Sequence, residues 1–472
     1  MTPLPEIATA AVRSALVGAG AVAGGLAIRR LVGAERGWRL TAAWALLLTP
    51  VLTPAALTGY AYANFCLSLI HHPGWNVALY GLLLWCKVTP VAAVVLLVSP
   101  GALTPEAAHC HRMLSGRTGA AGRVWREITF ELRANARACM AAGTVAFLLA
   151  FSDFELATLL GVPAWTVRLF DAHAGGLALT ESLRMALLPA LCQAAALGVI
   201  VALLLRERQA PTLPGEAHGP VSTPLRVAAW TWLIAAACAT AVVPLAVVAR
   251  SAMPAVGTLV ENFRTVETLW DIRSSLIFAG ATAVCAWLAA GMLVRMRPGW
   301  AVAAAAPGLF GALVLSLAVL ALFQTAALRP VYDTPLPLVL TLTLLLLPYA
   351  LLLRFLLCVV KPGTALRAAE MLCESPSAMV RRRGRALAGF YRSQGRFWVI
   401  ALVFVWAYFD LTASSILAPK LMTPILPRLY NFMHYGQSAG LSVLLCVAIA
   451  VPALALGAAW AGRRAYHAWR MM

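Results

Sequence analysis

Apolar runs of about 20 residues alternate with short polar segments along the whole chain. A bilayer core about 30 Å thick is crossed by roughly 20 residues of helix, so runs of this length favour membrane-spanning α-helices. The sequence predicts eleven of them, near residues 9–28, 40–65, 76–98, 136–160, 180–205, 226–249, 272–294, 300–323, 335–360, 397–418 and 437–462. We therefore expect an all-α, polytopic integral membrane protein with about 11 transmembrane helices.

Composition excludes the soluble classes. Hydrophobic residues make up 61% of the chain and charged residues 12%, whereas soluble domains carry about 25% charged residues. A soluble enzyme, a disulfide scaffold and a disordered tail are therefore excluded. The ten cysteines lie mostly inside apolar runs without CxxC pairs, which favours small buried side chains over zinc ligands. No metal site and no cofactor are expected.

Basic residues concentrate in alternate loops. The chain has 37 Lys and Arg against 18 Asp and Glu, and most of the basic residues lie in the segments 29–39, 100–137, 206–226, 295–297, 361–396 and 463–470. Cytoplasmic loops of membrane proteins carry such an excess. The pattern predicts a multi-pass protein of the plasma (inner) membrane with its N-terminus outside and its C-terminus cytoplasmic. It also explains the positive charge without nucleic acid as a partner.

The sequence repeats at an offset of about 260 residues. The segment 13–21 matches 273–281 at six of nine positions. Further landmarks follow in the same order at similar offsets: Pro50 and Pro307, Pro90 and Pro348, Asp153 and Asp410, Arg168 and Arg428, Pro189 and Pro452. We expect a first bundle of five spans over 1–205 and a second over 265–472. Residues 206–264 form a linker with one extra span and an outer loop.

The extra span sets the relation between the two bundles. Five is an odd number, so without a sixth helix the second bundle would enter the membrane upside down. With it, the bundles form a parallel repeat about an axis along the membrane normal. The expected product is a two-lobed assembly with a pathway between the lobes.

Short motifs in the two largest inner loops resemble a known family. Glu106-Ala107-Ala108, followed before the fourth span by Trp125-Arg126-Glu127-Ile128-Thr129-Phe130, is similar to the cytoplasmic loop of permeases of binding-protein-dependent ABC importers. Arg367-Ala368-Ala369-Glu370 occupies the matching place in the second copy. The outer-loop segments 161–176 and 429–436 resemble the fused, two-bundle permeases of the iron(III) type.

This resemblance implies partners and a division of labour. An ABC ATPase dimer would dock on short coupling helices, and an extracytoplasmic binding protein would deliver iron(III) or a similar small ligand. The coupling residues carried over are Glu106, Ala107, Ala108, Trp125, Ile128, Arg367, Ala368, Ala369 and Glu370. The chain itself would not be an enzyme and would have no catalytic residues, since no lysine follows a glycine as in a phosphate-binding loop.

The chain departs from the family pattern in both loops. Arg367 stands where the family has glutamate, and Arg112 and Cys373 stand where it has glycine. The run Arg381-Arg382-Arg383 is expected to meet anionic membrane lipid.

Two matched carboxylates fall near the outer ends of spans four and ten. A charge inside the bilayer costs about 2.5–3.5 kcal/mol on insertion scales, so each needs a reason. Asp153 with Glu155, and Asp410 with Ser414, are candidates for a pathway or gate. The alternative is that both aspartates cap helices or form hydrogen bonds between them. Lys87, in span three, is expected to be paired or to extend towards the interface.

Two other functions remain open from the sequence. A secondary transporter or channel would use Asp153 and Asp410 to couple a cation or proton gradient. A permease-like protein that has lost its ATPase coupling would also fit the altered inner loops.

Overall fold

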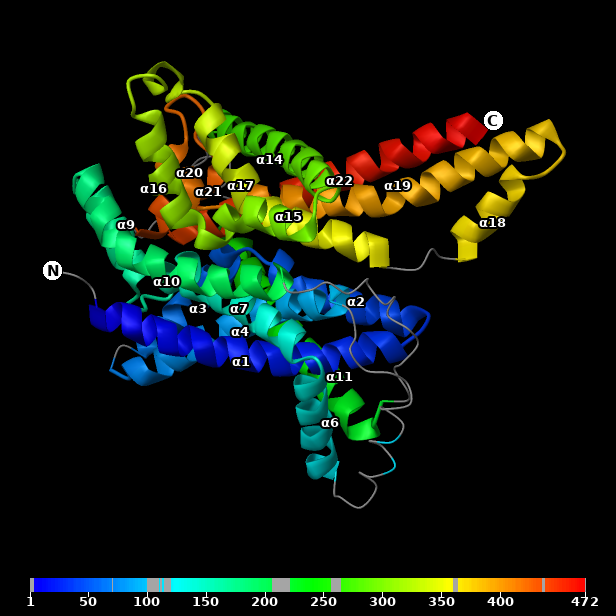
Figure 1. The fold of residues 1–472 in the computed structure, drawn as a ribbon. Helices are drawn as coiled ribbons and strands as arrows, with labels where there is room; N and C mark the ends of the chain where they lie inside the picture. The colour runs from blue at the N-terminus through cyan, green and yellow to red at the C-terminus, as the bar shows by residue number, and fades with distance from the viewer. Residues whose placement is uncertain are drawn as a thin grey trace.

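The structure is a computed structural model that describes residues 4–69, 71–99, 110, 113, 120–205, 221–255, 265–359, 364–434 and 438–471. Every regular element within these ranges is helical. This confirms the all-α prediction. Figure 1 shows the chain as two packed groups of helices, with the N-terminus at one end and the C-terminus at the other.

The first group contains nine described helices. They are α1 (Leu4–Ala34), α2 (Trp38–Leu52), α3 (Ala55–Ser68), α4 (Pro73–Val98), α6 (Ala120–Ala134), α7 (Ala136–Phe151), α8 (Glu155–Leu159), α9 (Trp165–Ala174) and α10 (Leu179–Leu205). A continuous helical rod follows, made of α11 (Thr223–Ala237), a π-helical turn (Cys238–Val242) and α12 (Val243–Ala252), and it ends in a short 3-10 turn (Met253–Ala255).

The second group follows the rod in the chain. Its helices are α14 (Thr265–Leu293), α15 (Pro298–Ala305) with the 3-10 helix η3 (Ala306–Phe310), α16 (Ala312–Phe323), the 3-10 turn Arg329–Val331, α17 (Leu336–Val359), α18 (Thr364–Cys373), α19 (Ala378–Tyr408), α20 (Thr412–Leu417), α21 (Ile425–His434) and α22 (Ser438–Met471).

Seven helices in the described ranges are long and apolar enough to cross a membrane. They lie at Leu4–Ala34, Pro73–Val98, Leu179–Ala202, Thr223–Ala252, Glu267–Leu293, Leu336–Leu357 and Gly440–Trp469. Three bent helix pairs raise the number to ten if each pair is one span. One predicted run, 397–418, has no counterpart among these ten. It is divided between the end of α19 and α20, with the chain turning near Asp410.

Two of the predicted spans are broken at matching places. Helices α2 and α3 meet at 73°, and α15 with η3 meets α16 at 96°. At the first break Thr53 is extended (ψ 122°), because the ring of Pro54 disfavours helical backbone in the preceding residue. At the second, Gly311 has φ +81°, which a glycine adopts without strain. Each break ends one helix and begins the next inside the protein.

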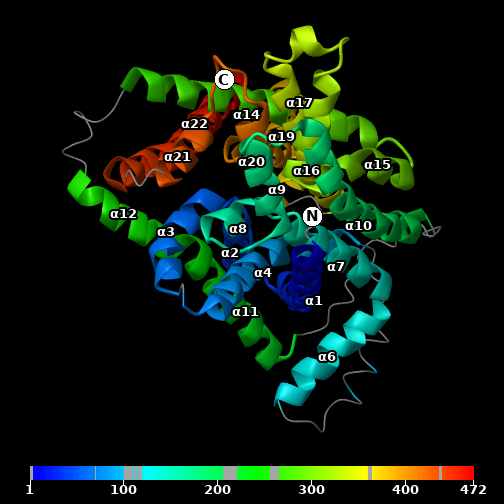
Figure 2. The same cartoon turned by 90° about the vertical axis from the view of Figure 1, so that its left-hand side faces the viewer.

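Three helices packed against one another form the centre of each group. Helix α1 packs against α4 and α7, and α14 packs against α17 and α19. The last helix of the first group, α10, packs against α15, η3 and α16 of the second, and α4 contacts α17 across the seam between the groups. Figure 2 shows the two groups side by side, with α12 beside α3 and α22 on one flank.

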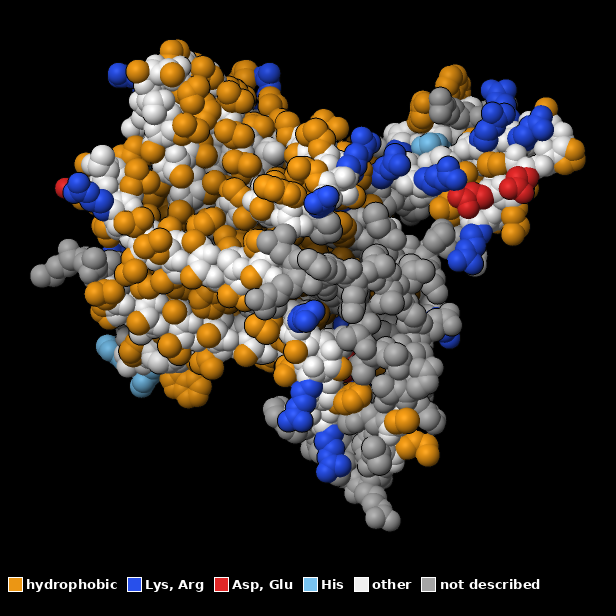
Figure 3. All heavy atoms as spheres, viewed as in Figure 1, with side chains coloured by type: hydrophobic (Ala, Val, Ile, Leu, Met, Phe, Trp, Pro, Cys, Tyr) orange, Lys and Arg blue, Asp and Glu red, His pale blue; other side chains and the backbone are white. Residues whose placement is uncertain are grey.

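The surface divides into an apolar body and basic arms. In Figure 3 hydrophobic side chains cover the part of the molecule nearer the N-terminus, and Lys and Arg side chains gather on the arms at the other end. One arm holds α18, the Arg-rich first half of α19 and the end of α22, and α6 forms the other (Figure 1). This is the distribution of a membrane-embedded body with basic segments on one side.

Close helix packing in the second group generates a prediction. Ala286 on α14 is fully buried, whereas Val284, two residues earlier, is 52% exposed. Ala286→Leu should destabilise the protein by about 1–3 kcal/mol, because the packed interior has no space for the larger side chain. Thermal unfolding in detergent measures this, with Val284→Leu as the matched control. Equal midpoints for the two variants would contradict the packing described here.

Candidate functional site

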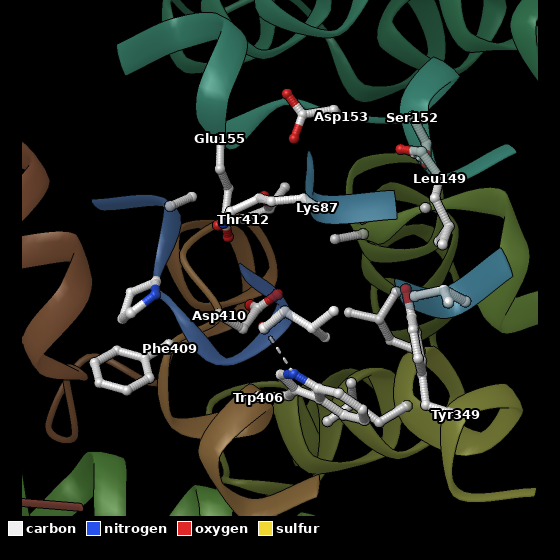
Figure 4. A pocket seen from close by; sticks show the side chains of 18 of the residues that line it. Lys87, Leu149, Ser152, Asp153, Glu155, Tyr349, Trp406, Phe409, Asp410 and Thr412 are labelled. Carbon is white, nitrogen blue, oxygen red and sulfur yellow. Dashed lines mark hydrogen bonds between the residues drawn. The ribbon is translucent and has the colours of Figure 1, made fainter. Parts of the chain in front are cut away.

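A pocket of about 270 Å³ lies at the seam between the two helix groups. Matching elements line it from both sides: the two helix breaks, the middle of α4 and α17, and the turns that follow α7 and α19. Figure 4 shows its charged and aromatic side chains. The four ionisable side chains on its wall are Lys87, Asp153, Glu155 and Asp410.

Asp153 is fixed at the start of α8. Its Oδ2 accepts hydrogen bonds from the backbone N–H of Ala157 at 3.2 Å and from the Tyr80 hydroxyl at 3.0 Å. Its carbonyl oxygen accepts a hydrogen bond from Thr166 at 2.8 Å. A carboxylate here satisfies an N–H that the short helix leaves unpaired.

Asp410 has the equivalent role at α20. Its Oδ2 accepts the backbone N–H groups of Ala413 at 2.9 Å and Ser414 at 3.1 Å. The side chain is only 9% exposed and Ser414 is buried. The two aspartates therefore both cap short helices and both line the pocket, and their role in a pathway or gate stays a prediction.

Glu155 joins the two groups. Its Oε1 accepts the backbone N–H of Leu411 at 2.8 Å, which places a carboxylate of the first group against the first turn of α20 in the second. Thr158 and Tyr430 add a hydrogen bond between hydroxyls across the same seam at 3.1 Å.

Lys87 reaches the pocket from α4. Its Nζ donates to the carbonyl oxygen of Thr53, the last residue before the break between α2 and α3, at 2.9 Å. The ammonium also interacts electrostatically with Glu155 and Asp153. The expectation of a paired lysine is therefore met by a carbonyl at close range and two carboxylates further away.

Aromatic side chains from the second group also line the pocket. Tyr349 of α17 and Trp406 of α19 have ring centroids 5.1 Å apart, and Phe409 lies one turn along the chain. The Trp406 indole N–H donates to the Val51 carbonyl at 3.1 Å and so fixes the ring against the α2–α3 break. The pocket thus brings Asp410 close to the aromatic side chains, while Asp153 and Glu155 lie further from them (Figure 4).

Matched ion pairs lie near the N-terminal end of the body. Arg168 contacts Glu6 at 2.9 Å, and Arg428 contacts Glu267 at 3.3 Å. Arg428 also contacts Asp271 at 2.6 Å. Each pair ties the helix after the fourth span to the first helix of its own group.

The predicted coupling residues are placed as follows. Glu106, Ala107 and Ala108 lie outside the described residues. Trp125 and Ile128 are in α6, where Ile128 packs against the core of the first group.

The coupling residues of the second copy are all in α18. Arg367 and Ala368 are exposed there and Ala369 is buried. Glu370 pairs with Arg392 of α19 at 2.8 Å. Helix α18 therefore folds back on α19 and keeps Arg367 on its outer surface.

Sequence reasoning missed several functional features. It did not connect Glu6 and Glu267 with the matched arginines, although these glutamates follow the same offset. It treated Lys87 as separate from the carboxylates, and nothing in the local sequence indicates that Tyr349 and Trp406 face them. The break before Pro54 lies inside the run 40–65, which the sequence predicts as one span; the proline itself is the local signal that could have indicated it.

Comparisons with known proteins give no relative. No family model matches the chain, no curated protein matches it, and no solved structure matches it. Within the described part of the chain, no group of three or more His, Cys, Asp and Glu side chains is placed to hold a metal ion.

The capping role of Asp410 generates a prediction. Asp410→Ala removes the acceptor of two buried N–H groups and should cost about 0.5–2 kcal/mol of stability. Asp410→Asn keeps an acceptor oxygen and should stay close to the parent protein. Thermal unfolding in detergent checks both, with Asp171→Ala, at an exposed position of α9, as the control. An unchanged midpoint for Asp410→Ala would contradict the capping role.

Proposed function

We propose that the chain is the membrane-spanning subunit of an ABC importer, with two fused permease bundles arranged as a parallel repeat over 1–205 and 265–472. The observation that carries the proposal is the seam pocket, lined by corresponding elements of both groups. A pathway between related bundles has this form in transporters built from internal repeats.

The order of elements supports the repeat. Each group has a first long helix, a broken pair, a helix with an internal proline, an inner-loop helix (α6 or α18), the helix that follows it (α7 or α19), two short helices and a final long helix. Helix α7 has 16 residues and α19 has 31. The break angles differ, at 73° and 96°, but both breaks line the same pocket. In this proposal the runs 136–160 and 397–418 are the fourth spans of their bundles, which gives eleven spans.

The coupling step rests on the inner loops. Helix α18 presents Arg367 on its surface and is held against α19 by the Glu370–Arg392 pair. A short helix fixed in this way transmits a push from a docked partner to the bundle as a rigid body. ATP hydrolysis takes place on the partner, and a binding protein delivers the small ligand, for which the resemblance implies iron(III).

A second function is favoured by one observation. Three carboxyl groups and one lysine share the pocket, an arrangement found where secondary transporters couple a cation or proton gradient. In that case transport by the purified chain would follow an imposed gradient without ATP.

Coupling to an ATPase is the decisive test. The chain is reconstituted with the candidate ATPase and binding protein encoded by neighbouring genes, and ATP hydrolysis stimulated by the loaded binding protein is measured. Arg367→Glu and Glu106→Lys should each lower this stimulation about tenfold or more, since reversing an interface charge costs at least 1.4 kcal/mol. Arg250→Glu, an exposed reversal at the other end of the body, is the control. Unchanged stimulation after both inner-loop reversals would overturn the coupling.

Membrane orientation is tested by single cysteines in a background without the native ones. Arg250→Cys should react with an impermeant maleimide in intact cells, because the proposed topology places it outside. Arg385→Cys, on the basic arm, should react only after permeabilisation. The reverse pattern would show that the orientation is inverted.

A further inference from the structure

We infer that the seam pocket binds a small organic cation, whose ammonium group binds beside the carboxylates. This inference rests on the proposed transport function for the role of the pocket in a pathway. It keeps the transport role and replaces iron(III), the ligand that the resemblance implies, with an organic cation.

The pocket has more acidic than basic side chains. Three carboxyl groups, Asp153, Glu155 and Asp410, face a single ammonium group in the pocket. Buried charges are stable in proteins when they are paired or when a bound ion completes their pairing. A positive ligand improves this balance, and an anion makes it worse.

The carboxylate oxygens in the pocket differ in their hydrogen bonds. Each carboxylate uses one oxygen to accept an N–H: Asp153 from Ala157, Glu155 from Leu411 and Asp410 from Ala413 and Ser414. Asp153 has two more donors, the Tyr80 hydroxyl and the Leu156 backbone N–H, whereas no described residue donates a hydrogen bond to the second oxygen of Glu155 or of Asp410. Asp410 is nine-tenths buried, so its free oxygen has few partners other than an occupant of the pocket. The helix caps hold these oxygens in fixed positions.

The ammonium group of Lys87 is only partly satisfied by described residues. An ammonium group has three donors, and the structure gives Lys87 one hydrogen bond, to the Thr53 carbonyl. It influences Glu155 and Asp153 through space while remaining bonded to a neutral group. Because Lys87 is held by Thr53 and forms no ion pair with a described carboxylate, a second cation can bind beside the carboxylates while Lys87 keeps this bond.

The pocket suits an organic cation better than a bare metal ion. The described carboxylates are not grouped closely enough to ligate one metal. The pocket is also lined by Tyr349 packed against Trp406, close to Asp410 (Figure 4), and aromatic faces attract organic cations by about 0.5–2 kcal/mol. A volume of about 270 Å³ suits a molecule of one ring or less.

Ligand binding at this position also bears on movement of the two groups. Glu155 accepts a hydrogen bond from the Leu411 N–H across the seam, and Asp410 is the residue just before Leu411. A cation bound between Glu155 and Asp410 therefore touches both groups at the point where they are joined.

The test is binding to the purified chain in lipid nanodiscs, without ATPase or binding protein, by isothermal titration calorimetry. The probe is benzylammonium, and benzyl alcohol and benzoate are its neutral and anionic matches. Benzylammonium should bind at least tenfold more tightly than either. Glu155→Gln and Asp410→Asn should each weaken its binding about tenfold, whereas the exposed Glu181→Gln should not.

Lys87→Met keeps the inference testable even if a carboxylate variant fails to fold. Removing the competing ammonium should tighten benzylammonium binding about fivefold or more. Loss of binding in Lys87→Met, equal binding of benzoate, or tight binding of ferric citrate with none of benzylammonium would overturn the inference. Because no ATPase is present, these outcomes are independent of the coupling test above.

Discussion

The pairing of charge at the seam is the constraint on which the rest of this structure depends. Two helix groups with largely apolar surfaces meet at a pocket lined by four charged residues, of which Asp410 is buried and the other three are partly buried. Ionised groups are stable there only if donors and acceptors are supplied locally. The short helices α8 and α20 supply N–H groups to Asp153, Glu155 and Asp410, and the end of α2 supplies a carbonyl to Lys87. The interruptions of the long helices are therefore what make the charged pocket possible.

Similar short sequences occur on the two sides of the pocket. A proline in the middle of α4 matches one in α17, and an aspartate after α7 matches one after α19. Similar local sequences give similar local turns, so each group brings the same kinds of residues to the seam. The pocket is nevertheless unequal, because Lys87 has no counterpart in α17 and the aromatic pair Tyr349 and Trp406 belongs to the second group.

Much of the fold could be predicted from the sequence, because length and hydropathy determine where helices form in a membrane. The all-helical class, the ranges of most long helices and the pairing of Asp153 with Asp410 followed from pattern and offset. The helix breaks were harder, since hydropathy does not register a turn inside an apolar run; Pro54 gave a local signal and Gly311 a weaker one. Contacts such as Glu155 with Leu411 or Trp406 with Val51 join residues some 250 to 360 positions apart. Such contacts depend on three-dimensional packing that no local pattern encodes.

The rod formed by α11 and α12 stands outside the repeat and makes the two flanks of the molecule different. Helix α11 packs on α1 and α2, and α12 bridges α3 of the first group and α22 of the second. On the other flank, where α10 meets α15 and α16, no described helix bridges the groups in this way. A relative rotation of the two groups would therefore pivot on the flank that α12 bridges and separate the helices on the other. The rod between the groups would thus act as a hinge that sets the direction of such a rotation.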